Sequence, residues 1–200
     1  IDLRSGEEGE SFFTEVEDQG ALNTSSTCSV LSLLEYFERR VLGQTFEGSK
    51  QFLYWVTFSW RYKQQQLISD IGADLRTTLK MLVQFGVPPE EFWPYDTSNF
   101  DNEPSSFIFR IAKPRADILY FRLDEPNCHG TSTWETLTSF LEAGFPIAFG
   151  FSVPSSITRD ANIHYRANFD SIQGGQAALA VGYKNDWFGR GQHALLIRNS

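Results

Sequence analysis

Ser25 carries a hydroxyl, a group able to act as a nucleophile, and it falls at the expected start of a helix. Apolar residues spaced by three and four predict an amphipathic helix from Ser25 to about Arg40, with Asn23 or Thr24 as its cap. The first turn of a helix points unpaired backbone N–H groups outward, where they stabilise a nucleophile or an oxyanion. A serine hydroxyl nevertheless attacks only when a base takes its proton.

Three imidazoles are candidates for this base, at His129, His164 and His193. His193 begins an expected strand that ends at Asn199, so the two residues should lie roughly 20 Å apart. His164 falls in an expected loop, where an exposed or hydrogen-bonded histidine is the usual case, although a loop is able to curl back. His129 follows Cys128 in an expected turn, and no second pair has metal-ligand spacing. We therefore expect no metal site and no cofactor.

The remaining pattern divides the chain into a helical first half and a strand-rich second half, which is an α+β layout. Helices are expected at 49–66 and 74–85, with Gly86 as the stop, and at 134–143. Strands are expected at 118–123, 146–151, 177–183 and 194–198.

Three short segments rich in glycine and amide residues occur in a characteristic order along the chain. Gln19-Gly20 precedes Ser25 by six and five residues, Gly174-Gly175-Gln176-Ala177 lies far downstream, and Asn199-Ser200 ends the sequence. This order resembles the papain-type cysteine proteases, peptidase family C1 of clan CA, and is nearest to bacterial and cyanobacterial members. In that family a Gln-Gly pair precedes a reactive Cys, a Gly-Gly-His-Ala strand carries the general base, and an Asn orients it. Leu34-Glu35-Tyr36 and the segment 86–95 also resemble the family.

The resemblance implies a papain-like two-lobe fold over residues 1–200. The helical lobe would cover about 1–115 and the β-rich lobe about 116–200. Family members continue past their Asn-Ser with further strand residues, so the resemblance also implies a segment that these 200 residues do not include. Ile1 is not an initiator Met, so we interpret any leader or propeptide as removed or not included.

The same resemblance assigns roles to single residues. It places Gln19 in the oxyanion hole and Ser25 at the nucleophile position. It places Gln176 at the position of the general base and Asn199 at that of the residue that orients the base. Asp70-Ile71-Gly72 would line one wall of the cleft. The chain departs from the family at two of them, because the nucleophile position holds Ser25 and the base position holds Gln176. An amide has no basic nitrogen, so neither replacement compensates for the other.

Cys28 lies one helical turn after Ser25 and is a second candidate nucleophile. Counting six residues from Gln19 reaches Ser25 instead, so we interpret Cys28 as a buried packing residue. Two arrangements of the amides remain open. The residues at 19, 25, 176 and 199 either form a neutral cluster that binds a peptide carbonyl, or Gln176 and Asn199 bond to each other and fill the old site.

Composition narrows the function classes further. A formal net charge of −8 and a pI near 4.9 argue against a nucleic-acid partner, because phosphate binding relies on clustered Lys and Arg. No apolar stretch approaches the roughly 20 residues of a transmembrane helix. Two cysteines form no disulfide framework, which is compatible with a soluble cytoplasmic protein and leaves the compartment undetermined.

The leading hypothesis is a catalytically inactive papain-like domain that acts on a protein or peptide partner as a scaffold, assembly subunit or regulatory module. The main alternative is a C1-type cysteine peptidase whose catalytic residues were altered by engineering. A serine hydrolase with a relocated base is a third hypothesis. The sequence gives no indication of oligomeric state.

Overall fold

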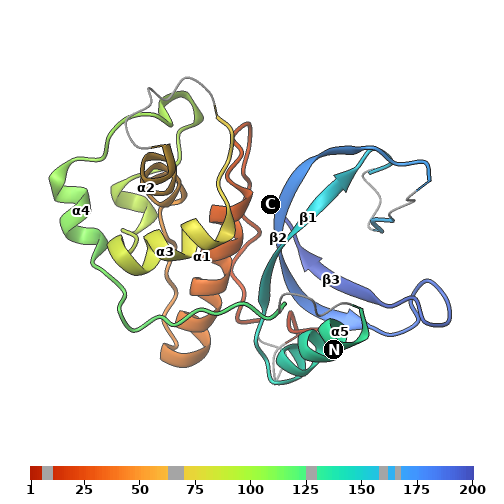
Figure 1. Cartoon of the computed structure of the whole chain (residues 1–200). Helices are drawn as coiled ribbons and strands as arrows, with labels where there is room; N and C mark the ends of the chain where they lie inside the picture. The colour runs from red at the N-terminus through yellow and green to blue at the C-terminus, as the bar shows by residue number, and fades with distance from the viewer. Residues whose placement is uncertain (6–10, 63–69, 125–129, 158–161, 165–167) are drawn as a thin grey trace.

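The computed structural model describes residues 1–5, 11–62, 70–124, 130–157, 162–164 and 168–200. The helices are α1 (Ser25–Phe37), α2 (Lys50–Tyr62), α3 (Leu75–Phe85), α4 (Ser106–Ala112) and α5 (Thr131–Glu142), and the strands are β1 (Ile147–Pro154), β2 (Ile172–Lys184) and β3 (Ala194–Arg198). Helices α1 to α4 gather on one side, and the sheet with α5 forms the other (Figure 1). The expected α+β class is confirmed.

Local capping signals set the ends of the helices. The Ser49 hydroxyl accepts a hydrogen bond from the Phe52 N–H at the start of α2, at 3.2 Å. The Asp74 carboxylate accepts one from the Thr77 N–H at the start of α3, at 2.9 Å. Helix α3 ends at Gly86, as the sequence predicts. The expected extension of α2 beyond Tyr62 falls on residues outside the described ranges.

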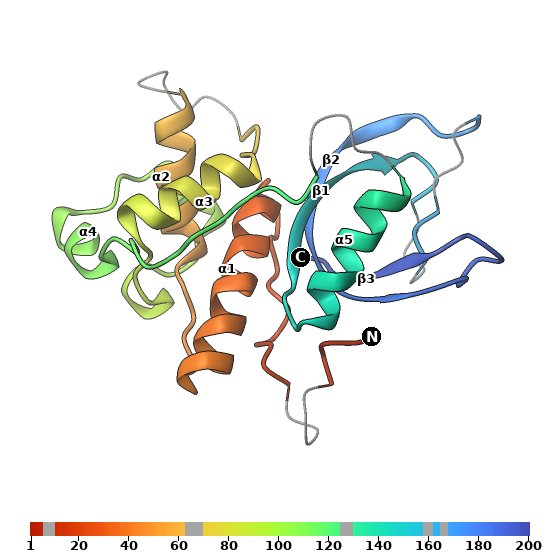
Figure 2. The ribbon, with the colours of Figure 1, turned by 60° about the horizontal axis from the view of Figure 1, so that its bottom comes forward.

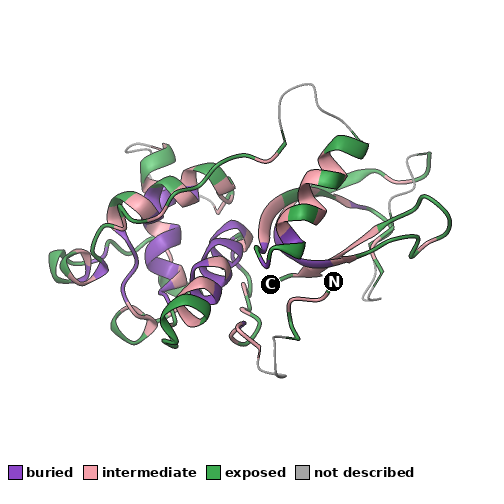
Figure 3. Ribbon diagram, turned by 90° about the horizontal axis from the view of Figure 1, so that it is seen from below, coloured by how far each residue is buried: buried purple, intermediate pink, exposed green. Residues whose placement is uncertain are grey.

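Helix α1 is buried on more sides than an amphipathic helix would be. It lies between the other helices and the sheet (Figure 2), and its first half is enclosed almost completely (Figure 3). The residues buried there are mostly small: Ser26, Thr27, Cys28, Ser29, Val30, Leu31 and Ser32. Small side chains allow close approach on several sides, so the apolar stripe at Leu33, Phe37 and Val41 is not the only packed face. Val41 itself lies beyond α1, in the π-helical turn Glu38–Leu42, and is 72% exposed.

The hydrophobic core has two parts. One joins the helices and includes Val30, Leu31, Phe52, Leu53, Met81 and Leu82. The other joins α1 to the sheet and is formed by Phe13, Tyr36, Leu179 and Val181. Because α1 contributes to both parts, it fixes the position of the helices relative to the sheet.

The sheet has the order β1-β2-β3 and both pairs are antiparallel. Ala180, in the middle of β2, lies opposite Ile147 on one side and Ile197 on the other. The first residues of the chain also join this sheet, since the Leu3 N–H donates to the Val181 carbonyl at 2.8 Å. The N-terminal segment therefore lies with the sheet, although it precedes all the helices in sequence.

The strand expected at 118–123 is wrong. This segment forms no ladder with any strand of the described residues, and Leu119 and Phe121 are 91% and 69% exposed. Its apolar composition suits a strand, but a strand needs a neighbour for its backbone hydrogen bonds. The segment instead runs between α4 and α5, where the Phe121 ring contacts that of Phe140 at 5.7 Å.

No helix in the described part of the chain combines the length and apolar character that a bilayer crossing demands.

Two glycines with similar φ angles give a matched test of how the helices are connected. Gly86 has φ 73° and ψ −159°, and a Cβ there would lie 1.7 Å from the Lys113 carbonyl oxygen. Gly43 has φ 65°, and no atom of the described residues beyond its chain neighbours lies within 4 Å of its Cβ position. Gly86→Ala should lower the free energy of unfolding by about 3 kcal/mol or more, and Gly43→Ala by about 1 kcal/mol.

Urea titrations followed by tryptophan fluorescence will measure both changes. If the free energy of unfolding fell equally in the two variants, the close approach of the Lys113 carbonyl to Gly86 would not be the reason that position 86 requires glycine.

Candidate active site

The structure brings the four predicted polar residues together. The Gln176 side chain lies in β2 and donates through Nε2 to Gln19 Oε1 at 3.3 Å and to Asn199 Oδ1 at 2.9 Å. Asn199 directly follows β3, and Ser25 is the first residue of α1. Of the two arrangements left open, the bond between Gln176 and Asn199 is present, and Gln19 joins it.

The Ser25 hydroxyl is held by the backbone of β2. The Ala177 N–H donates to Ser25 Oγ at 3.2 Å, and Ser25 is only partly exposed. Thr24 is the N-cap residue, but its side chain does not cap the helix. The bond from Ala177 uses the Ser25 hydroxyl as an acceptor, so it does not take the hydroxyl proton.

Two residues near Gln19 were not foreseen from the sequence. The Ser200 hydroxyl donates to Gln19 Oε1 at 2.9 Å, and the Tyr95 hydroxyl donates to the Gln19 carbonyl at 2.6 Å. Tyr95 also lies 3.2 Å from the Thr24 hydroxyl. Tyr95 falls in the segment 86–95 and Ser200 in the Asn199-Ser200 pair, and both stretches resemble the family, which was the available signal for each.

The described histidines are engaged elsewhere. His193 Nδ1 accepts from the Asp186 N–H at 3.2 Å, and its ring stacks on Trp134 with centroids 5.0 Å apart. The His164 ring packs against Phe188 at 4.3 Å. Among the described residues neither imidazole is hydrogen-bonded to the Ser25 hydroxyl. The expectation for His129 falls on a residue outside the described ranges.

Cys28 has the character of a packing residue. It is 2% exposed, and burial raises the pKa of its thiol to about 11, although the Thr24 hydroxyl lies 3.8 Å from its sulfur. A thiol with so high a pKa carries almost no thiolate at neutral pH and is a poor nucleophile.

A cleft of about 670 Å³ opens beside Ser25 and Gln176. Ile71 and Gly72 line one wall of this cleft, as the sequence predicts. Asp70 braces that wall instead of lining it, because its carboxylate accepts from the Asn23 N–H at 2.6 Å and from the Tyr54 hydroxyl. Burial is the first cause that raises the Tyr54 pKa, so this hydroxyl stays protonated and keeps donating.

The other wall of the cleft comes from the sheet and was not predicted. It consists of Gly150, Phe151 and Ser152 from β1 and of Gly174 and Gly175 from β2. At Gly174 and Gly175 no atom of the described residues, chain neighbours aside, lies within 4 Å of the point that a Cβ would occupy, which leaves this part of the wall open toward a ligand. At the rim, Arg61 and Asp74 form an ion pair at 2.5 Å.

No protein-family model matches the chain. Over 190 residues the chain is 27% identical to an uncharacterized peptidase C1-like protein of Acanthamoeba polyphaga mimivirus. This match covers 92% of the chain, which spans 58% of the length of that relative.

Solved structures of cysteine proteases share the arrangement of helices and strands. Xylellain, a cysteine protease from Xylella fastidiosa, has a TM-score of 0.66 at 22% identity, over 90% of this chain and 68% of its own. Digestive procathepsin L 3 of the Tenebrio molitor larval midgut has a TM-score of 0.62 at 18% identity, over 100% of this chain and 59% of its own. The chain has the papain-like cysteine protease fold. The fold expected from the sequence is confirmed.

Within this papain-like fold, a buried carboxyl group links the N-terminal segment to the site. Glu35 of α1 is 1% exposed and accepts from the Thr14 hydroxyl at 2.8 Å and from the Gly48 N–H at 3.1 Å. Arg198, the last residue of β3, donates to the Thr14 carbonyl at 2.9 Å and adjoins Asn199. Burial raises the Glu35 pKa to about 7, since these hydrogen bonds and Arg198 offset only part of the loss of solvation, and Glu17 adds a like charge.

The raised Glu35 pKa predicts a pH dependence of stability. The folded state favours the protonated carboxyl, so the contribution of Glu35 is complete below about pH 4.5 and is lost as the pH rises through about 7. The full difference is on the order of 3 kcal/mol. Glu35→Gln keeps the side-chain shape without the titration, so the pH dependence should flatten in this variant relative to the wild type.

Urea unfolding between pH 4.5 and 8 measures this difference. Glu47→Gln, on the exposed residue beside Gly48, is the matched control and should keep the wild-type pH dependence. Parallel curves for the wild type and Glu35→Gln would contradict the assignment.

Proposed function

We propose that this chain is a catalytically inactive papain-like domain that binds an extended peptide or protein segment in the cleft beside Ser25, as a scaffold, assembly subunit or regulatory module. The observation that carries the proposal is the place of Gln176, whose amide is bonded between Gln19 and Asn199. In the papain-like resemblance this is the position of the general base.

The chemistry of the cluster supports the loss of catalysis. A papain-type reaction needs an imidazole to form the thiolate and later to protonate the leaving amine. Ser25 offers a hydroxyl of much higher pKa than a thiol, and the Gln176 amide accepts no proton at neutral pH. The oxyanion-hole donor Gln19 and the helix start remain, so what the site retains is the capacity to bind.

The cleft suits a neutral, hydrogen-bonding ligand. The two N–H groups of Gln176 Nε2 are directed to Gln19 and Asn199, which leaves the Gln176 carbonyl oxygen as an acceptor. Among the described residues no hydrogen bond uses the amide nitrogens of Gln19 and Asn199, so they are further donors next to Gln176, although neither residue lines the cleft itself. Peptide groups present the same pairing of one donor with one acceptor.

The first test is peptide hydrolysis by the purified chain. We expect turnover of a fluorogenic peptide no greater than that of Ser25→Ala, because the hydroxyl has no base. The double variant Ser25→Cys with Gln176→His restores both groups of the reaction and reports whether the rest of the site is competent.

Turnover by the wild-type chain that Ser25→Ala abolishes would overturn the inactive state. It would equally favour the hydrolase hypothesis with a relocated base.

The second test captures the ligand. A photoreactive benzoyl-phenylalanine at Ile71, which is 60% exposed in the cleft wall, should cross-link peptides from a tryptic digest of cell proteins. The matched control places the same group at Phe107 of α4, which is 64% exposed and does not line the cleft.

Gly174→Trp should fill the cleft and abolish the adducts at position 71, whereas Gly174→Ala should keep them. Equal labelling at positions 71 and 107 would mean that the cleft does not select peptides.

A further inference from the structure

Among the described residues, two charged side chains line the cleft beside Ser25, those of Arg61 and Asp74. Arg61 lies in the last turn of α2, and Asp74 is the N-cap residue of α3. The two side chains are 42% and 48% exposed, so both are within reach of a ligand in the cleft. Their hydrogen bonds decide which of the two charges a ligand meets.

The Asp74 carboxylate is largely occupied by contacts within the protein. Its Oδ1 accepts from the Thr77 N–H at 2.9 Å. Its Oδ2 accepts from the Thr77 hydroxyl at 2.9 Å and from Arg61 Nη1 at 2.5 Å. Three of the roughly four acceptor sites of the carboxylate are therefore in use. A cationic ligand would have to compete with Arg61 and with the first turn of α3.

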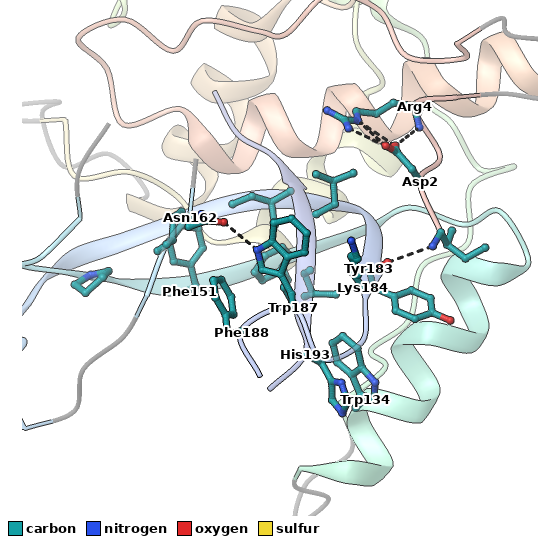
Figure 4. Close-up of a pocket in the computed structure, with 18 of the residues that line it drawn as sticks. Asp2, Arg4, Trp134, Phe151, Asn162, Tyr183, Lys184, Trp187, Phe188 and His193 are labelled. Atoms are coloured by element: carbon teal, nitrogen blue, oxygen red, sulfur yellow. Dashed lines mark hydrogen bonds and ion pairs between the residues drawn. The ribbon is translucent and has the colours of Figure 1, made fainter. Parts of the chain in front are cut away.

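The Arg61 guanidinium is engaged at one end only. It donates one hydrogen bond, through Nη1, and among the described residues none uses its Nε or Nη2. Elsewhere in the chain this edge binds carboxylates, since Arg4, Arg115 and Arg122 each donate to an aspartate through Nε and Nη2 together. Figure 4 shows the pair formed by Arg4 and Asp2. Arg61 therefore keeps free the two parallel donors that match a carboxylate best.

We propose that Arg61 makes the cleft selective for a peptide segment with an acidic side chain, whose carboxylate accepts from Arg61 Nε and Nη2 together. This inference rests on the function proposed above and adds the class of segment that binds. The neutral groups beside Ser25 bind the peptide backbone, and Arg61 distinguishes the side chains. Because the site is half exposed, the preference over an uncharged side chain is about fivefold and weakens as the salt concentration rises.

The test uses the photoreactive group at Ile71 with three pools of octapeptides whose ends are blocked. Each pool is random over uncharged residues except at one fixed position, which holds Glu, Gln or Lys. Glu and Gln have nearly the same shape, so the first two pools differ in charge alone. We expect the otherwise wild-type chain to capture the Glu pool about fivefold more than the Gln pool, and the Lys pool least.

Variants of the charged pair separate binding from support of the fold. Arg61→Gln should capture the Glu and Gln pools equally, and Arg61→Lys, which keeps the charge without the parallel donors, should show an intermediate preference. Asp74→Asn should capture more of the Glu pool than the wild type does. Asn also caps a helix, and it leaves Arg61 without a competing carboxylate. A merely structural role for the pair predicts no such gain.

Arg76→Gln is the matched control. Arg76 is an exposed residue of α3 that does not line the cleft, and its replacement changes the net charge of the chain as Arg61→Gln does. This variant should keep the wild-type preference for the Glu pool. Circular dichroism and the urea midpoint of each variant separate lost binding from lost folding.

Two results would overturn this proposal and leave peptide binding intact. One is equal capture of the Glu and Gln pools by the wild-type chain, and the other is an unchanged preference in folded Arg61→Gln. If no pool labelled position 71 more than position 107, the function proposed above would fail, and this inference would fail with it.

Discussion

The contact between the first turn of α1 and the middle of β2 is the interaction on which the site depends. The Ala177 N–H donates to Ser25 Oγ, joining residues 152 positions apart in the sequence. Behind it, Tyr36 of α1 packs with Leu179 and Val181 of β2, which are fully buried. Gln19, Gln176 and Asn199 come from three separate segments, and they meet only because this packing fixes α1 against the sheet. The small side chains of α1 are the sequence feature that permits so close an approach.

The polar cluster is stable without any charge. Imidazole, thiolate and carboxylate groups lose solvation when they enter a cleft, and they need partners that compensate for it. Carboxamides lose less solvation than ions do, and hydrogen bonds between them offset that loss, as the two bonds of Gln176 do. An amide at position 176 therefore holds Gln19 and Asn199 together without a group that titrates near neutral pH. If the function proposed above holds, the site no longer catalyses hydrolysis, and its neutral hydrogen-bond donors and acceptors serve to bind a ligand.

Much of this arrangement could be predicted from local sequence, and the errors have physical causes. The Gln19 to Ser25 spacing, the stop at Gly86 and the strand at 194–198 all follow from local signals, and the structure has each of them. The segment 118–123 has strand composition but no neighbour in the described sheet, and composition alone does not supply one. Ser200, the glycine wall and the Glu35 link to Arg198 depend on strand register and helix placement. Register is a property of pairs of segments, so a single segment does not reveal it.

A second pocket, of about 1060 Å³, lies on the sheet beside α5 and meets the cleft at one strand pair (Figure 4). Phe151 of β1 lies directly opposite Gln176 of β2, and opposed residues of an antiparallel pair project to the same face. Phe151 lines both the cleft at Ser25 and this second pocket. A ligand that moved this ring would therefore act on the neighbour of the amide that holds Gln19 and Asn199. Such coupling needs two discrete positions of the ring, each favoured by a different ligand, because a ligand with equal affinity for both would shift nothing. Ser152 also lines both pockets but carries no ring, so Phe151 is the larger of the two side chains there that a ligand would move.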